Sequence, residues 1–123
     1  MFMDSRLLVE LAANACDDRK AIDIQLIDIS KVSTLADWIL VTEGKSDVQV
    51  RAISKSVEDK LEKEAKRLPR RKEGINEGKW ALLDYGDIII NIFRTEERSY
   101  YELELFWSHG DKYKYKSSDQ EFI

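Results

Sequence analysis

The segment KWALLDYGDIIINIF, residues 79–93, places two apolar runs on either side of an acidic turn. This pattern predicts a β-hairpin, in which successive side chains point to opposite faces. If Tyr85 and Gly86 form a two-residue loop, glycine supplies the positive φ that such loops require, and Trp80 lies opposite Asn91. One face then contains Ala81, Leu83, Ile88, Ile90 and Ile92, and the other contains Trp80, Leu82, Asp84, Asp87, Ile89, Asn91 and Phe93. A one-residue change of register would exchange the two faces.

The two predicted faces differ in character. The first is purely aliphatic, and we expect a helix to cover it. The second combines aromatic, aliphatic, amide and acidic side chains, a composition typical of a protein interface with a central Trp. On this interpretation Asn91 need not be buried. The alternative is that the last helix of the chain covers this face and that Asn91 makes a buried hydrogen bond.

Three helices are predicted around the hairpin. Ser5 can cap the first, whose apolar residues recur at helical spacing. Ser46 and Gln49 have the spacing of a capping box, so they begin a longer helix, which Pro69 ends. Thr95 can cap a last helix, because two acids follow it in the first turn, where the helix dipole favours negative charge.

Two further strands, residues 21–29 and 37–43, precede the longer helix. The predicted order is therefore α-β-β-α-β-β-α, which indicates one small α/β domain with a mixed sheet packed by helices. Residues 70–79 contain two glycines and no apolar periodicity, so we predict a mobile loop there. The polar residues 108–123 are predicted to form a flexible C-terminal tail beyond a domain of residues 1–107.

Charge is unevenly distributed along the 123 residues, whose net charge is −4. Residues 45–72 hold ten bases and five acids, whereas residues 1–44 hold eight acids and four bases, and residues 73–123 hold eleven acids and six bases. This balance favours a basic protein partner over a nucleic acid backbone. We expect a cytoplasmic protein, because there is no leader sequence and no run of about 20 apolar residues.

The sequence contains little that would support catalysis. Cys16 is the only cysteine, and its place on an apolar helical face predicts packing. Residues 43–46, EGKS, offer a Gly and a Ser that a phosphoryl transfer loop could use, but no predicted strand carries the carboxylate pair that two-metal chemistry needs. Asp84 and Asp87 flank a turn and would bind a metal only weakly, and the only histidine, His109, lies in the predicted tail. We predict no enzyme, cofactor or metal; an active or degenerate transferase is the alternative.

A direct RNA-binding module is a second alternative. The bases that would form it are Lys55, Lys63, Lys66, Arg67, Arg70, Arg71 and Lys72. A solvated helix face with paired charges explains the same pattern, so only Arg70 and Arg71 are kept as candidates for a peripheral contact with RNA.

Three segments, LADWILVTEGKSDVQVRAI, EGINEGKWALLDYGDIIINIF and EERSYYELELFW, resemble the ribosomal silencing factor (Iojap-like) family. The resemblance implies a small α/β domain related in fold to nucleotidyltransferases. It also implies binding to one basic protein of the large ribosomal subunit at the intersubunit face. The resemblance further implies that this binding blocks subunit association and represses translation. A homodimer of the free protein is compatible with the same exposed sheet face.

Site residues also follow from the resemblance. The family's aromatic and acidic block falls on residues 80–87, and its final block falls on residues 97–107. The chain departs from the usual Tyr, Asn and His of the family at Trp38, Lys45 and Asn91; asparagine can hydrogen-bond like a neutral imidazole but does not titrate. The predicted partner-binding residues are Trp80, Leu82, Asp84, Tyr85, Asp87, Asn91, Glu97, Arg98, Tyr101 and Glu104.

Overall fold

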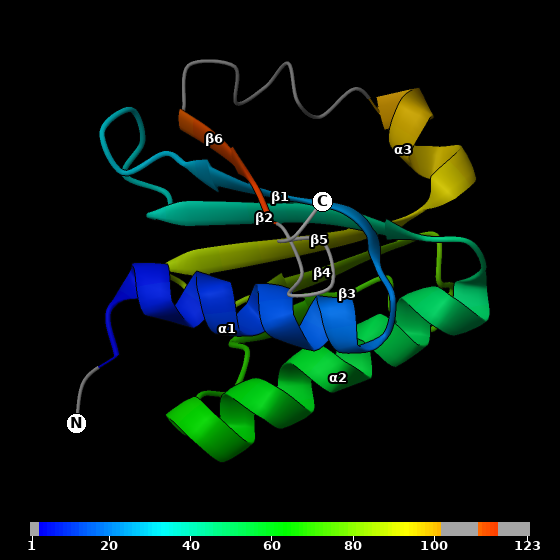
Figure 1. Cartoon of the computed structure of the whole chain (residues 1–123), viewed down its shortest axis with the longest axis horizontal. Helices are drawn as coiled ribbons and strands as arrows, with labels where there is room; N and C mark the ends of the chain where they lie inside the picture. The colour runs from blue at the N-terminus through cyan, green and yellow to red at the C-terminus, as the bar shows by residue number, and fades with distance from the viewer. Residues whose placement is uncertain (1–2, 102–110, 116–123) are drawn as a thin grey trace, which may run out of the picture.

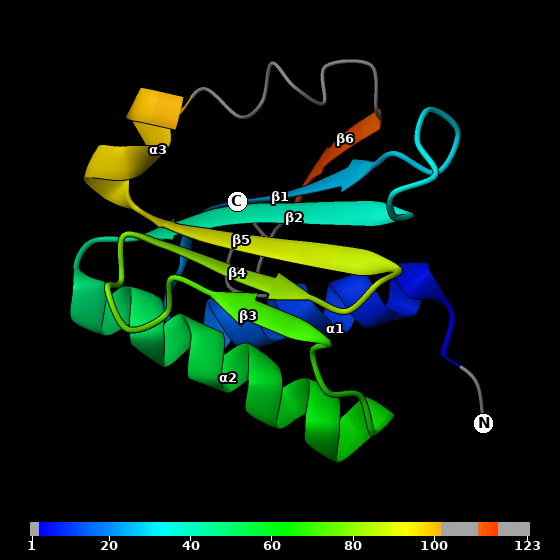
Figure 2. The ribbon, with the colours of Figure 1, turned by 180° about the vertical axis from the view of Figure 1, so that it is seen from behind.

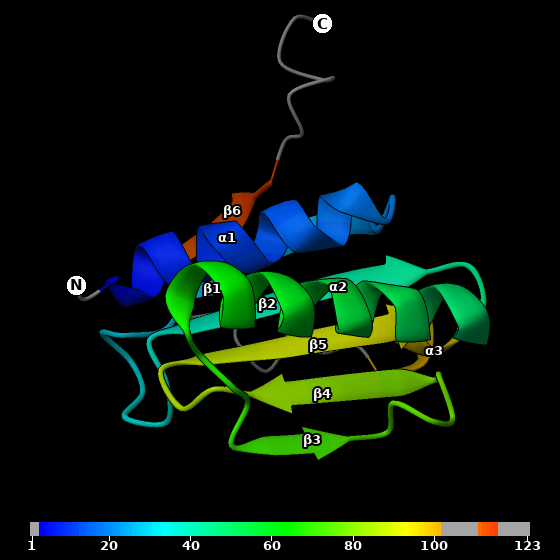
Figure 3. The same cartoon turned by 90° about the horizontal axis from the view of Figure 1, so that it is seen from below.

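A computed structural model describes residues 3–101 and 111–115 of the chain. Its described elements are α1 (Ser5–Asp18), β1 (Ile22–Asp28), β2 (Trp38–Gly44), α2 (Asp47–Ala65), β3 (Arg71–Glu73), β4 (Trp80–Asp84), β5 (Ile88–Arg94), α3 (Thr95–Tyr101) and β6 (Asp111–Lys114). The strands form one mixed sheet in the order β3-β4-β5-β2-β1-β6, in which only β2 and β5 pair in parallel. Helices α1 and α2 cover one face, and α3 lies on the other side (Figures 1 and 3). The predicted α/β class and mixed sheet are confirmed, while the nucleotidyltransferase likeness stays a prediction.

The boundaries of α1 and α2 each differ from the predicted ones at one end. Asp4, not Ser5, caps α1, because its carboxylate accepts a hydrogen bond of 2.8 Å from the Leu7 amide. Ser46 caps α2 as predicted, with its hydroxyl accepting from the Gln49 amide at 3.1 Å. This helix ends at Ala65, before Pro69, because Lys66 adopts the left-handed conformation with φ of 54°.

The hairpin forms with a register two residues away from the predicted one. Gly86 and Asp87 form its loop, and the Tyr85 amide donates to the Ile88 carbonyl across it. Gly86 has φ of 92°, so glycine occupies the first loop position, where such turns favour it. Trp80 therefore lies opposite Phe93 and not opposite Asn91. A shift of two leaves the faces unchanged, so the predicted division is confirmed for the strand residues, whereas Asp87, predicted on the second face, lies in the loop.

Both edges of the sheet carry short strands that the sequence pattern does not predict. Arg71–Glu73 pairs with β4, although a loop was predicted there (Figure 2). Asp111–Lys114 pairs with β1, so the prediction of a loose tail is wrong for these residues. Gly74 follows β3 with φ of 74°, and a Cβ atom there would lie 2.0 Å from the Trp80 carbonyl oxygen. Only glycine fits this close approach.

Two groups of buried side chains form the core. The larger lies between the sheet and helices α1 and α2, and it includes Cys16, whose predicted packing role is confirmed. The smaller lies on the opposite face of the sheet and consists of Ile27, Ile29, Ala36, Ile39, Val41 and Phe93, with Trp80 and Ile89 packed against it. The second face of the hairpin therefore packs on a buried apolar group of its own.

Candidate functional site

The candidate site is the face of β4 and β5 that points away from α1 and α2. We call it the contact face, and its residues are Trp80, Leu82, Asp84, Ile89, Asn91 and Phe93. Three apolar members, Trp80, Leu82 and Ile89, are half-buried, whereas Phe93 is fully buried beneath them. A half-buried Trp at the centre of mixed side chains is typical of an interface anchor.

Asn91 is joined to Trp80 on this face. The indole Nε1–H donates to the Asn91 Oδ1 atom at 3.0 Å, and the Trp80 and Phe93 rings lie 4.9 Å apart at 31°. Because Trp80 lies opposite Phe93, the hydrogen bond to Asn91 runs diagonally across the two strands. Asn91 is only 2% exposed, so the expectation that it need not be buried is wrong. Of the alternative, the buried hydrogen bond is confirmed, with Trp80 as its donor, and coverage of this face by the last helix stays a prediction.

The acids of the turn have partners within the chain. Asp87 accepts two hydrogen bonds from the Arg67 guanidinium, at 2.7 and 3.3 Å, and this hydrogen bonding raises the pKa of Arg67. Asp84, which is buried, accepts from Arg70 at 3.3 Å and from the Gly86 amide at 2.8 Å. Bases of the same chain therefore already balance most of the charge of these two acids. The sequence predicts instead that Asp84 and Asp87 contact the partner protein.

Arg67 is the residue of this region whose role sequence reasoning missed. The sequence indicates it only as part of a basic helix surface, yet it follows α2 and also donates to the Tyr85 carbonyl at 2.9 Å. No local spacing signals this contact, because 20 residues separate Arg67 from Asp87. Arg70 and Arg71, the candidates for an RNA contact, are both exposed, and both lie within ion-pair distance of Asp84.

Tyr85 belongs to the core and not to the contact face. Its side chain is 5% exposed and packs in the group of residues under α1 and α2. Burial raises the pKa of the phenol, whose oxygen has no hydrogen-bond partner. We therefore remove Tyr85 from the contact residues: the side chain is already enclosed by its own protein.

Arg98 is also internal. It donates to the Asp23 carbonyl at 2.9 Å and to Glu43 at 3.1 Å, and thereby ties α3 to β1 and β2. Glu97 is half-buried and accepts from Arg94 at 2.8 Å. The structure thus gives both residues positions that support α3. The side chain of Tyr101 and all of Glu104 lie outside the described residues.

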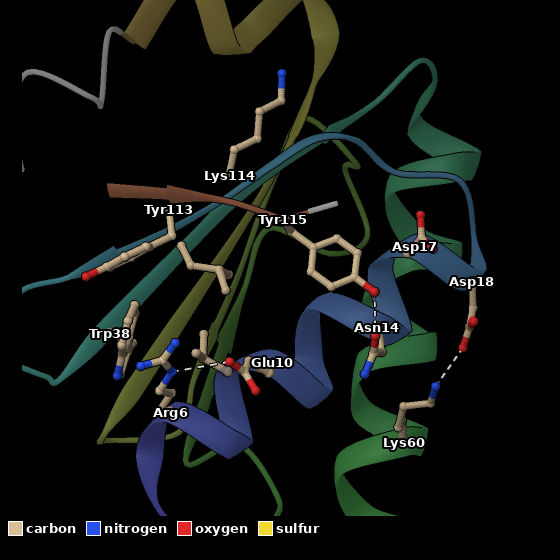
Figure 4. Close-up of a pocket in the computed structure, with 12 residues that line it drawn as sticks. Arg6, Glu10, Asn14, Asp17, Asp18, Trp38, Lys60, Tyr113, Lys114 and Tyr115 are labelled. Carbon is tan, nitrogen blue, oxygen red and sulfur yellow. Dashed lines mark hydrogen bonds and ion pairs between the residues drawn. The ribbon is translucent and has the colours of Figure 1, made fainter. Parts of the chain in front are cut away.

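A separate cavity of about 570 Å³ lies between α1 and β6 (Figure 4). Trp38 and Tyr113, with ring centroids 5.8 Å apart, line one end. Several charges on its wall are paired within the chain: Lys60 with Asp18 at 2.7 Å, and Arg6 with Glu10 at 3.3 Å. Tyr115 also hydrogen-bonds to Asn14. The cavity therefore offers aromatic edges and paired charges, and none of the predicted site residues lines it.

The described residues give no geometry for a metal or a reactive thiol. Within residues 3–101 and 111–115, no group of three His, Cys, Asp or Glu residues is placed to hold a metal ion. Burial, helped by two neighbouring acids, raises the pKa of the Cys16 thiol, which keeps it protonated. Among the described helices, none has the length and apolar character that a membrane crossing requires.

Comparisons with known proteins extend along nearly the whole chain. The family model described as "Ribosomal silencing factor during starvation" matches residues 3–122. Ribosomal silencing factor RsfS of Bacillus subtilis (strain 168) is 38% identical over 105 residues, covering 85% of this chain and 88% of that protein. The chloroplastic protein Iojap of Zea mays is 29% identical over 98 residues, covering 80% of this chain and 42% of that protein.

The fold has solved relatives as well. An X-ray crystal structure of a protein from Chromobacterium violaceum superposes with a TM-score of 0.82 at 31% sequence identity, covering 98% of this chain and all of that one. A crystal structure from Bacillus halodurans gives a TM-score of 0.74 at 35% identity, covering 84% of this chain and 95% of that one. The match in sequence and the match in structure agree, and the chain belongs to the ribosomal silencing factor family.

Proposed function

We propose that this protein binds the large ribosomal subunit through one of its basic proteins at the intersubunit face, blocks association with the small subunit and so represses translation. The observation that carries the proposal is the family match over residues 3–122, together with relatives that are named ribosomal silencing factors. That regulatory name fits a protein that acts by occupying a surface and not by catalysis. A cytoplasmic location follows from the same function.

The contact face supports this proposal by its composition. Trp80, Leu82 and Ile89 provide half-buried apolar surface on a rigid sheet, and large aromatic anchors on rigid elements dominate binding energy at protein interfaces. Asp84 and Asp87 have internal partners, so attraction to a basic partner comes from the net charge of −4 more than from these two acids. Of the predicted residues, we keep Trp80 and Leu82 as direct contacts.

Peripheral contact with ribosomal RNA is a finer part of the proposal. Arg70 and Arg71 expose 66% and 61% of their side chains beside the hairpin turn, so each can turn from Asp84 towards a phosphate. The double substitution of both residues by Gln is expected to lower affinity for the large subunit mainly at low salt. An equal loss of affinity at all salt concentrations would contradict a phosphate contact.

Self-association through the contact face is proposed for the protein in the absence of ribosomes, since the apolar part of this face could bury itself against a second copy. Sedimentation velocity across a range of concentrations measures this directly. A purely monomeric protein at every concentration would contradict it without affecting the proposed ribosome contact.

Mixing the protein with purified large and small subunits tests the function. After centrifugation through a sucrose gradient, we expect the joined-ribosome peak to shrink as the protein is added, and the protein to sediment with the large subunit alone. Leu7→Ala, at an exposed position of α1, serves as the control and should act like the original chain. An undiminished joined peak at saturating protein would overturn the proposal.

A further inference from the structure

Asn91 is a buried residue whose amide oxygen has a hydrogen-bond partner and whose amide nitrogen has none. It lies in the middle of β5, beside Val41 of β2 and Leu82 of β4, and is 2% exposed. Its Oδ1 atom accepts from the Trp80 indole, whereas its Nδ2 atom is buried with no hydrogen-bond partner. A buried donor without an acceptor destabilises a fold, because it gives up water and gains nothing in return.

Stability alone therefore does not explain an amide at this position. The neighbouring β5 residues that are equally buried, Ile90, Ile92 and Phe93, are all apolar. An aliphatic side chain at position 91 would fit the same strand without leaving a donor unpaired. The other buried polar side chains of the described strands, Thr42 and Asp84, have hydrogen-bond partners, so the unpaired donor of Asn91 indicates a site kept for function.

The amide oxygen determines the orientation of the Trp80 indole. Packing against Phe93, with centroids 4.9 Å apart, holds the plane of the indole ring but does not distinguish its two edges. The hydrogen bond of 3.0 Å to Asn91 does distinguish them, because only one edge carries Nε1–H. The close approach of Gly74 to the Trp80 carbonyl also restrains the backbone at this residue. Ring plane, ring edge and backbone are thus each restrained by a different contact.

We propose that Asn91 is a positioning residue: its amide oxygen holds Trp80 in the single orientation that the ribosomal partner meets. The inference rests on the proposed function, since it treats Trp80 as the anchor of that contact. An anchor held in its bound orientation loses less conformational entropy on binding, which strengthens the complex without adding a contact. The Nδ2 group without a partner lowers the stability of the fold, and this loss accompanies the positioning of Trp80.

Asn91→Leu and Trp80→Phe test the proposal from both ends of the hydrogen bond. Each variant is expected to lower affinity for the isolated large subunit about three- to tenfold, the size of one neutral hydrogen bond. The double variant should bind no more weakly than Trp80→Phe alone, because each change removes the same interaction. Asn91→His should restore binding, since a neutral imidazole nitrogen can accept the indole proton.

The indole resonance in a ¹⁵N-labelled sample separates positioning from simple structural support. Trp80→Phe identifies the Trp80 peak among the three tryptophans of the chain. In Asn91→Leu we expect this peak to shift and broaden while the urea midpoint stays the same or rises. Thr42→Val, which removes a buried hydroxyl bonded to the Ile22 carbonyl at 2.8 Å, is the matched control and should leave the peak in place.

Two results would overturn the inference. One is an unchanged Trp80 indole peak in Asn91→Leu with a large loss of stability, which would make Asn91 a purely structural residue. The other is full affinity in Trp80→Phe, which lacks the donor and does not depend on how well the Asn91 variant folds. If the original chain fails to bind large subunits, the proposed function fails, but the indole resonance still decides whether Asn91 orients the ring.

Discussion

The two faces of the β4–β5 hairpin are built from alternate residues of the same strands, yet they differ in nearly every physical property. The helix-covered face is uniformly aliphatic and fully buried, and its members are Ala81, Leu83, Ile88, Ile90 and Ile92. The contact face carries a half-buried indole, a buried amide and half-buried aliphatic residues. Identical backbone geometry thus supports two roles: one face stabilises the fold, and the other is the face that we propose meets a partner.

Neighbouring leucines give the sharpest test of this difference. Leu83→Ala on the helix-covered face should lower the free energy of unfolding by about 2–5 kcal/mol, because the cavity that it leaves is fully enclosed. Leu82→Ala on the contact face should lower it by less than ~1.5 kcal/mol, because the side chain is only half-buried. Urea unfolding measures both values. Equal losses would mean that the contact face is part of the core.

Trp80→Ala tests whether the contact face serves binding more than stability. We expect the variant to fold and to lose about 2–4 kcal/mol of binding free energy for the large subunit, as a central Trp typically does when truncated. Circular dichroism checks the fold, and co-sedimentation at several subunit concentrations gives the affinity. Leu7→Ala, an exposed apolar truncation on α1, should leave the affinity unchanged. Full binding by a folded Trp80→Ala protein would place the contact elsewhere.

The turn that joins the two faces depends on an ion pair. Arg67→Met removes the paired hydrogen bonds to Asp87 and should reduce stability by about 1 kcal/mol, because both side chains are about one-third exposed. Lys55→Met, which breaks the far more exposed pair with Asp59, should cost less than ~0.5 kcal/mol. Thermal unfolding at low and high salt compares the two. A larger loss of stability in Lys55→Met than in Arg67→Met would contradict the role that we give to the ion pair of the turn.

The smallest expected effect concerns the loop that packs beside the contact face. Hydrogen bonds from the Ser30 hydroxyl and amide hold the pKa of Asp28 below its ordinary value. A lowered pKa contributes stability that is present above the unfolded-state value and lost as pH falls through the folded-state value. Ser30→Ala should therefore raise the pKa of Asp28 and remove ~0.5 kcal/mol or less at neutral pH. An NMR titration that shows no change in the pKa would contradict this.

Alternation in the sequence predicts which residues share a face, and the structure confirms this even though the loop is Gly86–Asp87 and not Tyr85–Gly86. Alternation determines only whether the register is even or odd, so a two-residue error leaves the faces intact. The edge strands Arg71–Glu73 and Asp111–Lys114 could not be predicted in this way, because all their residues are exposed and carry no apolar period. Backbone pairing with a neighbour is what forms them.

The candidate site was less predictable than the fold. The partners of Asp84 and Asp87 come from the segment after α2, and no local spacing reveals a contact between residues so far apart in sequence. Burial of Asn91 was missed for a related reason: periodicity identifies the face of a residue but not what covers that face. The position of Trp80 on the second face is confirmed, because alternation along the strand determines it, whereas its role as an interface anchor stays a prediction.

Site-specific crosslinking tests most directly whether the contact face is the surface that meets the ribosome. A photoreactive amino acid at Leu82, on the contact face, is compared with the same group at Leu7, on the exposed side of α1. After irradiation with isolated large subunits, we predict a crosslink from position 82 to a basic protein of the large subunit and none from position 7. A crosslink from position 7, with none from position 82, would contradict the assignment of the contact face.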